Sequence, residues 1–350
     1  PMAISGRDMR AGVFQGRRTI ELARRPRPEP APGEVLLRVE ACGVCGTDYH
    51  IWVGELTDGV EPPVVLGHEI AARVEQLGPG VAGFEPGQPC AVDPVIGCGT
   101  CRMCRSAREN LCRRPTIVGY KRDGGFAQYV CVPAGKVVPL DAAAGPAGGV
   151  LCETLACVVH GYDRLAPAAG ARVLVLGAGT VGLLWTVLLR GGPRARIVQT
   201  EPAAFRRGRA AELGADAAID PTAPDADAQL RDALDGGADC IVDATGEPQA
   251  VQRALGLLAP GGTLLIFGVC PAGSEVRFDP FELYNKEARI VASKMPPHTL
   301  DRSAALIAAG RIPCEQLVTA TFGLDELEAR IAGFHDRRDC QVKVAIDPWA

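Results

Sequence analysis

The chain has 350 residues and a formal net charge of −4, with 47% hydrophobic and 22% charged residues. These values are ordinary for a soluble globular protein, and the length favours two domains. The weak acidity gives no reason to expect nucleic acid or an anionic membrane as a partner. The apolar runs are too short, or too interrupted by glycine, to predict a transmembrane helix, and the N-terminal residues lack the pattern of a signal peptide.

The chain has fourteen cysteines. In a long chain without a signal peptide, such a number indicates metal sites and reduced thiols rather than a disulfide framework. We therefore expect a cytoplasmic protein.

The first 140 residues predict a β-rich domain. Short apolar alternations at 10–22 and 34–41 predict strands, separated by proline-rich turns. Residues 64–66 and 70–77 continue the pattern and end in a Gly-Pro-Gly turn. Proline and glycine then recur at close intervals, and few stretches have helical periodicity.

Two short motifs in this domain carry metal-binding residue types. Cys45, Thr47 and His50 lie within six residues, and His68 is followed directly by Glu69. Thiolate and neutral imidazole are preferred zinc ligands, and a catalytic zinc has three protein ligands and one open position. For either residue alone, a small buried thiol or a satisfied histidine is the simpler interpretation. Taken together, and with the dinucleotide motif described below, the two motifs favour Cys45 and His68 as two of these ligands.

A cysteine-rich segment follows at 97–113. Its spacing is C-x2-C-x2-C-x7-C, and four thiolates from one loop predict a closed structural zinc site. The spacing also begins like a bacterial ferredoxin motif, so an iron–sulfur electron carrier is the competing interpretation. The longer last gap and the absence of a second cysteine group make it the weaker one. The four cysteines are Cys98, Cys101, Cys104 and Cys112.

The periodicity changes near residue 153. Residues 153–165 predict a helix, and 172–176 predict a buried strand that leads directly into a G-x-G-x-x-G turn. Between a strand and a helix this motif predicts a dinucleotide site, because the helix N-terminus faces the pyrophosphate. The predicted helix covers 181–190. The turn consists of Gly177, Gly179, Thr180, Val181 and Gly182, with Ala178 between the first two glycines.

A second strand at 195–200 ends at Glu201, 19 residues after Gly182. A carboxylate there accepts hydrogen bonds from the adenosine ribose and repels a 2′-phosphate, so NAD is favoured over NADP. Arg206 and Arg207 would favour NADP if they faced the ribose. The simpler interpretation is that both lie on the solvated face of the next helix.

Four more predicted strands, at 216–219, 240–243, 263–267 and 289–292, alternate with helices. Six strands with intervening helices predict an α/β class with a doubly wound parallel sheet. Gly246 and Gly268 follow two of these strands, where the nicotinamide half of the cofactor should lie. Beyond residue 295, the pattern predicts helices at 300–309 and 324–334 and a strand at 342–346.

The run G-V-C-G-T-D-x-H, followed by P-x-V-x-G-H-E, resembles the zinc-dependent medium-chain alcohol and polyol dehydrogenases. Here it covers 43–50 and 63–69. The resemblance implies a GroES-like catalytic domain of residues 1–153 and 295–350 and a Rossmann domain of residues 154–294. It also implies a homodimer or homotetramer that transfers hydride between an alcohol and NAD. A zinc-free quinone reductase lacks these metal residues, and a binding protein without turnover does not need an open metal position.

The third ligand of the catalytic zinc is the open question of the resemblance. In the polyol and threonine-type branch, an acid followed by a proline-leucine pair occupies the position, which makes Glu153 the first choice. This chain has Thr154 where that branch commonly has proline. Glu69, as a ligand or through water, is the second choice, and Cys152 is the third.

The resemblance also implies a proton path. Thr47 accepts the alcohol proton through its hydroxyl, and His50 passes it to solvent because its pKa lies near neutrality. Asp48 supports the loop or the metal ligands. By family position only, four side chains line the substrate pocket: Tyr49, Trp52, Lys294 and His298. An NADP-dependent aldehyde or ketone reductase of the same fold is the alternative function.

Overall fold

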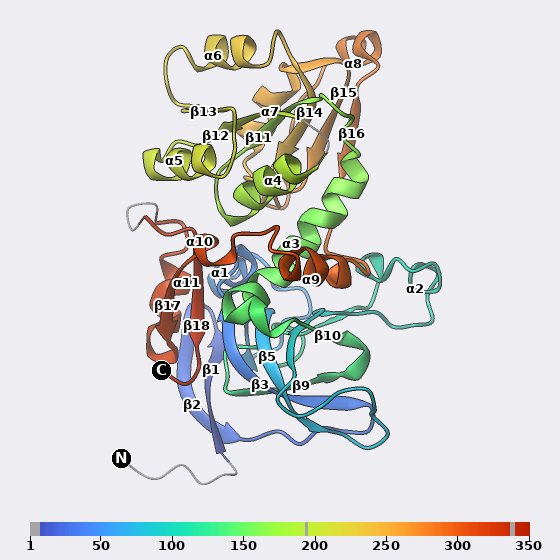
Figure 1. Cartoon of the computed structure of the whole chain (residues 1–350), viewed down its shortest axis with the longest axis vertical. Helices are drawn as coiled ribbons and strands as arrows, with labels where there is room; N and C mark the ends of the chain where they lie inside the picture. The colour runs from blue at the N-terminus through green and yellow to red at the C-terminus, as the bar shows by residue number, and fades with distance from the viewer. Residues whose placement is uncertain (1–7, 193–194, 337–339) are drawn as a thin grey trace. The chain divides into compact units, whose positions relative to one another are not determined.

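The computed structural model describes residues 8–192, 195–336 and 340–350. The chain forms two compact units (Figure 1). The first comprises the residues up to Ala156 together with Pro296–Ala350, and the second comprises Cys157–Met295. The resemblance implied boundaries at 153 and 295.

The first unit contains two larger antiparallel-rich sheets. One has the strand order β2-β1-β4, and the other has the order β10-β6-β5-β3-β18-β17, with β9 also pairing with β3. Their strands are β1 (Asp8–Gly16), β2 (Thr19–Pro26), β3 (Glu34–Gly43), β4 (Val64–Val65), β5 (Glu69–Leu77), β6 (Pro89–Val92), β9 (Tyr129–Pro133), β10 (Val137–Pro139), β17 (Val318–Gly323) and β18 (Lys343–Asp347). The predicted alternation at 10–22 is therefore a hairpin, because β1 turns back at Gly16 to pair with β2.

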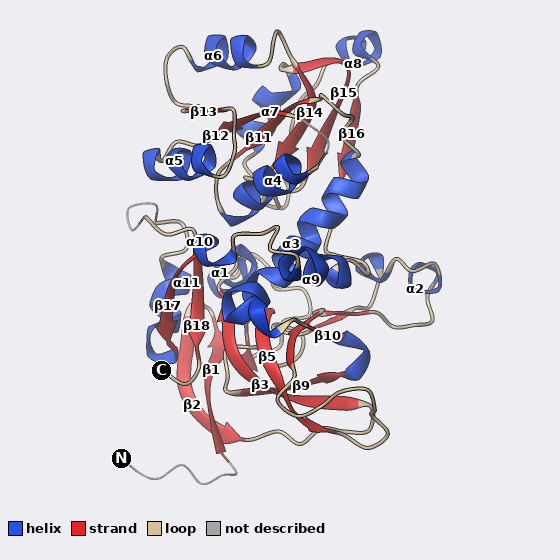
Figure 2. Ribbon diagram, in the orientation of Figure 1, coloured by secondary structure: helices blue, strands red, loops and turns tan. Residues whose placement is uncertain are grey.

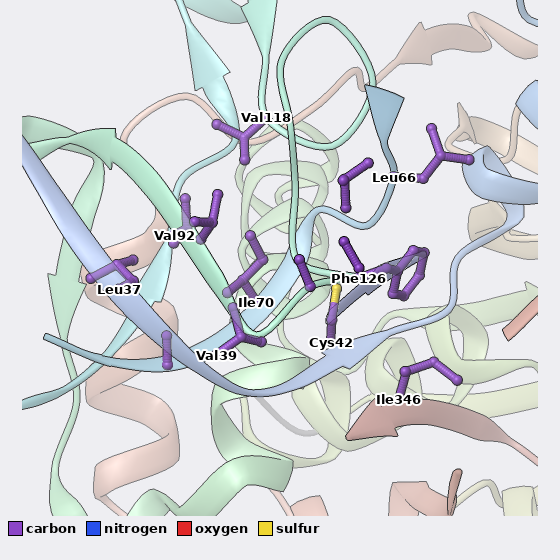
Figure 3. Close-up of a cluster of buried hydrophobic side chains, with 14 of the residues drawn as sticks. Leu37, Val39, Cys42, Leu66, Ile70, Val92, Val118, Phe126 and Ile346 are labelled. Atoms are coloured by element: carbon purple, nitrogen blue, oxygen red, sulfur yellow. The ribbon is translucent and has the colours of Figure 1, made fainter. Parts of the chain in front are cut away.

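The apolar faces of these strands form one core (Figure 3). Leu37 and Cys42 of β3, Ile70 of β5 and Ile346 of β18 are all at most 1% exposed. Ile346 pairs with Cys42, so the last strand of the chain completes a sheet that begins more than 300 residues earlier in the sequence. Alternation predicted these strands, but no local signal in the sequence predicted that pairing.

A small lobe projects from this unit. β7 (Val95–Ile96) and β8 (Thr116–Ile117) pair antiparallel and close the segment between them, which contains α2 (Arg102–Arg105) and η1 (Glu109–Leu111). Lys136 connects the lobe to the sheet, because its Nζ donates to Asp93 Oδ2 at 2.9 Å and to Glu109 Oε2 at 2.7 Å.

The first unit also contains short helices, some of which the sequence predicted. The predicted helices at 300–309 and 324–334 are confirmed, and the helix at 46–53 was missed. The helical segments are α1 (Gly46–Val53), η2 (Ala134–Lys136), η3 (Ala142–Ala144), α3 (Gly145–Leu165), α9 (Leu300–Ala308), α10 (Cys314–Leu317), η4 (Leu324–Glu326) and α11 (Leu327–Ala332). The residues of α3 from Cys157 onward belong to the second unit.

The helix α3 corrects one expectation. Ala142–Leu165 forms 24 continuous helical residues that are long and apolar enough, by length and composition, to cross a membrane. The glycines that suggested an interruption lie inside the helix, and Gly149 packs so closely on β5 that a Cβ there would lie 2.5 Å from the Cβ of Ala71. Within the apolar window, 67% of the residues are buried, as in the core helix of a soluble protein.

The second unit is built on a six-stranded parallel sheet of order β13-β12-β11-β14-β15-β16. The predicted doubly wound α/β arrangement is confirmed, with helices flanking the strands (Figure 2). The strands are β11 (Arg172–Leu176), β12 (Arg196–Thr200), β13 (Ala217–Ile219), β14 (Ala238–Asp243), β15 (Leu258–Ile266) and β16 (Arg289–Ala292). The helices are α4 (Thr180–Gly191), α5 (Ala204–Glu212), α6 (Ala226–Ala233), α7 (Pro248–Leu255) and α8 (Pro280–Lys286).

The centre of this sheet explains the continuous apolar run of β11. The strand pairs with β12 on one side and β14 on the other, and residues 173–175 are fully buried. The strand order reverses between β11 and β14, and ligands of such sheets bind at the carboxyl ends of the strands near this point. Trp185 of α4 is fully buried and contacts Tyr162 and Phe267 through its ring.

Candidate metal centres and cofactor site

The first candidate site begins where β3 ends. Cys45 is the N-cap of α1 and has an extended backbone, with φ −116° and ψ 157°. Asp48, in the first turn, accepts a hydrogen bond from the Cys45 N–H through Oδ2 at 2.9 Å. This closure fixes the cysteine at the helix N-terminus.

His68 lies between β4 and β5, and it is 7% exposed. Its Nδ1 lies 3.8 Å from Asp48 Oδ1. One donor atom each of Cys45, His68 and Glu69 lies within 4.8 Å of the others. Burial lowers the pKa of His68, but Cys45, Asp48 and Glu153 together raise it well above its ordinary value. Negative charge is therefore concentrated around His68, which suits a divalent cation.

Glu69 is almost fully buried and has partners on both carboxylate oxygens. Oε1 accepts a hydrogen bond from Thr154 Oγ1 at 2.8 Å, and Oε2 forms an ion pair with Lys343 Nζ. Burial raises the pKa of Glu69, but Lys343, His68 and the Thr154 hydroxyl together lower it below its usual value. Sequence reasoning missed Lys343, because only the strand order brings residue 343 beside residue 69.

The other two candidates for the third ligand lie side by side on α3. Glu153 is 7% exposed, and its carboxylate is near enough to His68 to raise the histidine's pKa. Burial, then Glu153, raises the pKa of Tyr120 to about 12. Cys152 Sγ instead lies 3.9 Å from the carbonyl oxygen of Leu300, and burial raises its pKa to about 12. Neither belongs to the group of donors around Cys45 within the described residues.

Thr47 and His50 lie one helical turn apart on α1, a spacing that puts them on the same side of the helix. Thr47 is half-buried, and the His50 ring is 31% exposed with Nδ1 2.7 Å from Glu55 Oε2. Sequence reasoning missed Glu55 as the partner that fixes the orientation of this ring.

The predicted pocket residues Tyr49 and Trp52 also lie on α1. Tyr49 stacks on Phe334 and meets His335 edge-on, with ring centroids 4.5 Å apart. The Arg18 guanidinium lies over Trp52. No local signal in the sequence pointed to Phe334 or His335.

Lys294 and His298 are both exposed. They belong to different units, and His298 adopts a left-handed backbone with φ 53°. The described contacts assign neither of them to a pocket.

The four cysteines of the lobe converge. Their Sγ atoms all lie within 4.8 Å of one another, and those of Cys101 and Cys104 are 3.5 Å apart. Backbone N–H groups point at the sulfurs, for example from Cys101 to Cys98 and from Arg114 to Cys112, each at 3.4 Å. The Thr100 hydroxyl and neighbouring N–H groups lower the pKa of Cys98 to about 5. This donor set fits a tetrahedral thiolate-bound metal with no open position.

The glycine-rich turn lies at the carboxyl end of β11. Gly177 has φ +91°, and a Cβ on Gly182 would overlap the carbonyl oxygen of Gly177. Gly179 is the N-cap of α4, and a Cβ there would meet nothing within 4 Å. Thr180 and Val181 begin the helix. The turn therefore leaves open space at the helix N-terminus, as a pyrophosphate site requires.

Glu201 follows β12 and is 4% exposed. Its Oε2 accepts from the Ala178 N–H and its Oε1 from the Ala203 N–H, each at 3.0 Å. Arg207 donates to the carbonyl oxygens of Glu201 and Pro202 and pairs with Asp220 at 3.2 Å. The Arg207 guanidinium therefore has protein partners, and the Glu201 carboxylate is fixed directly beside the glycine turn.

Gly246 and Gly268 follow β14 and β15 and pack on each other. A Cβ on Gly268 would overlap the backbone of Gly246, which has φ +69°. Asp243 holds this loop, because its Oδ1 accepts from the Thr245 hydroxyl at 2.6 Å and from the Gly246 N–H at 3.2 Å. Sequence reasoning did not single out Asp243.

A dinucleotide turn in one unit, with thiolate, imidazole and carboxylate donors gathered in the other, defines a metal-dependent oxidoreductase that uses a nicotinamide cofactor. Residues 31–142 match the alcohol dehydrogenase GroES-like domain, and residues 180–309 match the zinc-binding dehydrogenase domain. The chain belongs to the zinc-binding alcohol and polyol dehydrogenases with a GroES-like domain. The predicted family, GroES-like and Rossmann folds and enzyme class are confirmed.

Two relatives that are named as dehydrogenases are similar to the chain over most of its length. The chain is 34% identical to the L-galactonate-5-dehydrogenase of Escherichia coli K12, over 85% of this chain and 88% of the relative. It is 32% identical to the L-threonine 3-dehydrogenase of Pyrococcus abyssi, over 86% and 88%.

Solved structures are similar over nearly the whole chain. A zinc-binding dehydrogenase from Sinorhizobium meliloti 1021, bound to NADP, has a TM-score of 0.93 at 35% identity, over 97% of this chain and 99% of that one. An alcohol dehydrogenase from E. coli CFT073, complexed with NADH, has a TM-score of 0.90 at 27% identity, over 98% and 100%. The first of these two structures is named as a zinc-binding dehydrogenase, in agreement with the family model that matches residues 180–309.

Proposed function

We propose that the chain oxidises a secondary alcohol, polyol or hydroxylated metabolite with NAD at a zinc bound by Cys45 and His68. The observation that carries the proposal is the gathering of Cys45, His68 and Glu69 donor atoms within 4.8 Å. When bound, zinc lowers the pKa of an alcohol oxygen and polarises the carbonyl product, while the nicotinamide accepts the hydride. Relatives named for L-galactonate, D-arabinitol and D-altritol support a polyhydroxylated substrate.

The proposed third ligand is Glu153. Its buried carboxylate lies close enough to His68 to raise the pKa of the imidazole. A carboxylate leaves zinc more electrophilic than a second thiolate would. Glu69, directly or through water, and Cys152 are the second and third candidates. Asp48 accepts a hydrogen bond from the Cys45 N–H and lies beside Nδ1 of His68, so it helps to position both residues.

The proposed proton path runs along α1. The Thr47 hydroxyl accepts the proton of the alcohol, and His50, three residues later, transfers it to water through its exposed ring. Glu55 binds Nδ1 of His50 and so leaves Nε2 available for the transfer. The four cysteines of the lobe hold a second, structural zinc.

The proposed cofactor is NAD, held by the turn from Gly177 to Gly182 and by the loops at Gly246 and Gly268. The support is the fixed carboxylate of Glu201, which would repel a 2′-phosphate. An NADP-dependent aldehyde or ketone reductase is the second candidate, because a relative of 35% identity binds NADP.

The proposed assembly is a cytoplasmic homodimer, with a homotetramer as the alternative. The cysteines are present as thiols, which suits a reducing compartment. β16 is the last strand of its sheet, and its Ile290 is 41% exposed. Phe281 and Tyr284, on the preceding helix α8, are 68% and 78% exposed. Exposed apolar side chains of this kind, next in the sequence to an unpaired edge strand, are typical of a surface that another chain covers.

A panel of secondary alcohols, polyols and sugar acids tests the function. Formation of NADH or NADPH is followed by absorbance, and the metal content of the same sample is measured. Turnover of at least one hydroxylated substrate with NAD, in protein with two zinc ions per chain, is the expected result. Iron in place of zinc, or no turnover with either cofactor in zinc-loaded protein, would contradict the proposal.

A further inference from the structure

Two fully buried polar side chains of the second unit bind each other beside the glycine-rich turn. Gln199 on β12 and Thr186 on α4 are both 0% exposed. Gln199 Nε2 donates to the carbonyl oxygen of Gly177 at 2.8 Å, and Gln199 Oε1 accepts from the Thr186 hydroxyl at 2.6 Å. Because α4 packs on β11 and β12 (Figure 1), the pair connects the helix, the strands and the turn.

The chemistry of these partners allows one orientation of the Gln199 amide. A carbonyl oxygen can only accept, so the amide nitrogen must face Gly177. The amide oxygen then faces Thr186, whose hydroxyl has a single proton to donate. That hydroxyl also lies 3.2 Å from the carbonyl oxygen of Gly182, but its contact with Gln199 is shorter. Thr186 therefore fixes which end of the amide reaches the turn.

The peptide group between Gly177 and Ala178 is held at both ends. Its carbonyl oxygen accepts from Gln199, and its N–H donates to Glu201 Oε2 at 3.0 Å. Gln199 and Glu201 are two residues apart on an extended chain, so their side chains lie on the same face. The N–H of Gly177 itself donates to the carbonyl oxygen of Thr200 at 2.8 Å. Three successive residues at the end of β12 therefore bind the first residues of the turn.

The orientation of this peptide group determines what the turn presents to a ligand. Its carbonyl oxygen lies in the interior, because a Cβ on Gly182 would overlap it and would lie 3.1 Å from Gln199 Nε2. The opposite side is open, since a Cβ on Gly179 would meet nothing within 4 Å. N–H groups bind a pyrophosphate, and a carbonyl oxygen repels it. A rotation that brought this oxygen out of the interior would therefore weaken the site.

We propose that Gln199 and Thr186 are positioning residues for the cofactor, which hold the peptide group after Gly177 in the orientation that accepts a pyrophosphate. The inference rests on the proposed function, because it requires a dinucleotide at this turn. Neither side chain contacts the cofactor, since both are completely buried. A buried amide is stabilising only when its hydrogen bonds are made, and here the bond that it donates goes to the turn.

Binding of cofactor fragments tests the proposal. ADP-ribose contains the pyrophosphate and adenosine lacks it, so their affinities separate the turn from the ribose site at Glu201. The test variants are Gln199→Met and Thr186→Val, which keep similar side-chain volumes and remove the amide or the hydroxyl. Thr186→Ser is the control that keeps the hydroxyl. Displacement of NADH, followed by its fluorescence, gives the affinities, and a thermal melt shows that each variant is folded.

We expect Gln199→Met to weaken the binding of ADP-ribose and NADH about tenfold, as for the loss of one buried hydrogen bond. Thr186→Val should weaken both to a smaller extent, because the amide remains but its orientation is no longer fixed. Adenosine should bind every variant as it binds the wild type, and Thr186→Ser should resemble the wild type with all ligands. If Gln199→Met does not fold, Thr186→Val decides.

The negative results are distinguishable. Folded test variants with wild-type affinity for ADP-ribose would overturn the proposal and leave the pair as part of the core only, even if their melting temperatures fall. Equal losses of affinity for ADP-ribose and adenosine would also overturn it, because the effect would not be confined to the turn. A wild type that binds neither NADH nor ADP-ribose would instead contradict the proposed function.

Discussion

Two buried carboxylates, Glu69 and Glu153, lie close to His68, and their neighbours distinguish them. Glu69 has a lysine and a hydroxyl as partners, which satisfy both of its oxygens. Glu153 follows Cys152 on α3 and adds to the negative potential that raises the pKa of His68. At the scale of single residues, the role of a buried carboxylate near a metal site depends more on the side chains that contact it than on its distance along the sequence from a metal-binding motif.

Replacement of Glu153 tests its role as third ligand. We expect Glu153→Ala to lower kcat by about a hundredfold or more and to loosen the catalytic zinc, because one ligand is lost. Metal analysis after dialysis against a chelator, together with steady-state kinetics, measures both effects. Glu153→Cys should retain more zinc than the alanine variant. Full zinc content and normal turnover in Glu153→Ala would assign the acid to the helix alone and make Glu69 or Cys152 the leading candidate.

Replacement of Glu201 tests its role in the choice between NAD and NADP. Removing its carboxylate in Glu201→Ala should lower kcat/KM for NAD by about 10- to 100-fold, as expected for loss of a charged hydrogen bond. Use of NADP should fall less or improve, because the repulsion of the 2′-phosphate disappears. A wild type that prefers NADP would show that the NAD assignment is wrong. Since Glu201 also binds the Ala178 N–H, a thermal melt must show that the variant keeps its fold.

At the scale of elements, the short helix α1 holds several of the candidate site residues. Its eight residues and N-cap carry the proposed metal ligand Cys45, the aspartate that accepts a hydrogen bond from it, a hydroxyl and an imidazole. The sequence motif named all of these residues, but it did not predict a helix. Helical spacing is what places Thr47 and His50 on one side, in the order that a proton path requires.

The four-cysteine lobe is an element with a different dependence on metal. Because Cys104 lies in a closed donor set, Cys104→Ser should release about one zinc per chain and lower thermal stability more than the turnover of the protein that stays folded. Cys45→Ser should do the reverse, with near-normal melting and little turnover. Calorimetry, zinc analysis and kinetics on the two variants make the comparison. Equal losses of activity in both would argue against separate structural and catalytic metals.

At the scale of the whole molecule, the edge strand β16 sets the expected assembly. Tyr284→Asp and Ile290→Lys place charge on the exposed apolar side chains, and together they should shift the proposed dimer to monomer. A standard interface buries about 1,200–2,000 Å² and does not tolerate two unpaired charges. Sedimentation velocity measures the mass, and Phe205→Asp, on α5, is a control at another exposed aromatic residue. A monomeric wild type would contradict the assignment.

The sequence predicted much of this molecule because several signals were local. The alternation of apolar residues predicted β3 and β5. A buried apolar run next to a glycine-rich turn predicted β11 and α4, and the spacing of four cysteines predicted the metal-binding lobe. The contacts it missed depend on sheet order, as when β18 carries Lys343 to Glu69 and Ile346 to Cys42. Helix α3 was predicted too short, because glycines that permit close packing on a sheet resemble interruptions.

The position of Trp185 has a spectroscopic consequence. It is the sole tryptophan of the second unit, while Trp52 and Trp349 belong to the first and each lies beside an arginine. A fully buried indole emits at shorter wavelength than one in water. A variant with Trp52→Phe and Trp349→Phe should therefore report unfolding of the nucleotide-binding unit by its fluorescence alone. Titrating NAD into that variant would show by how much the cofactor stabilises this unit, with no substrate and no turnover required.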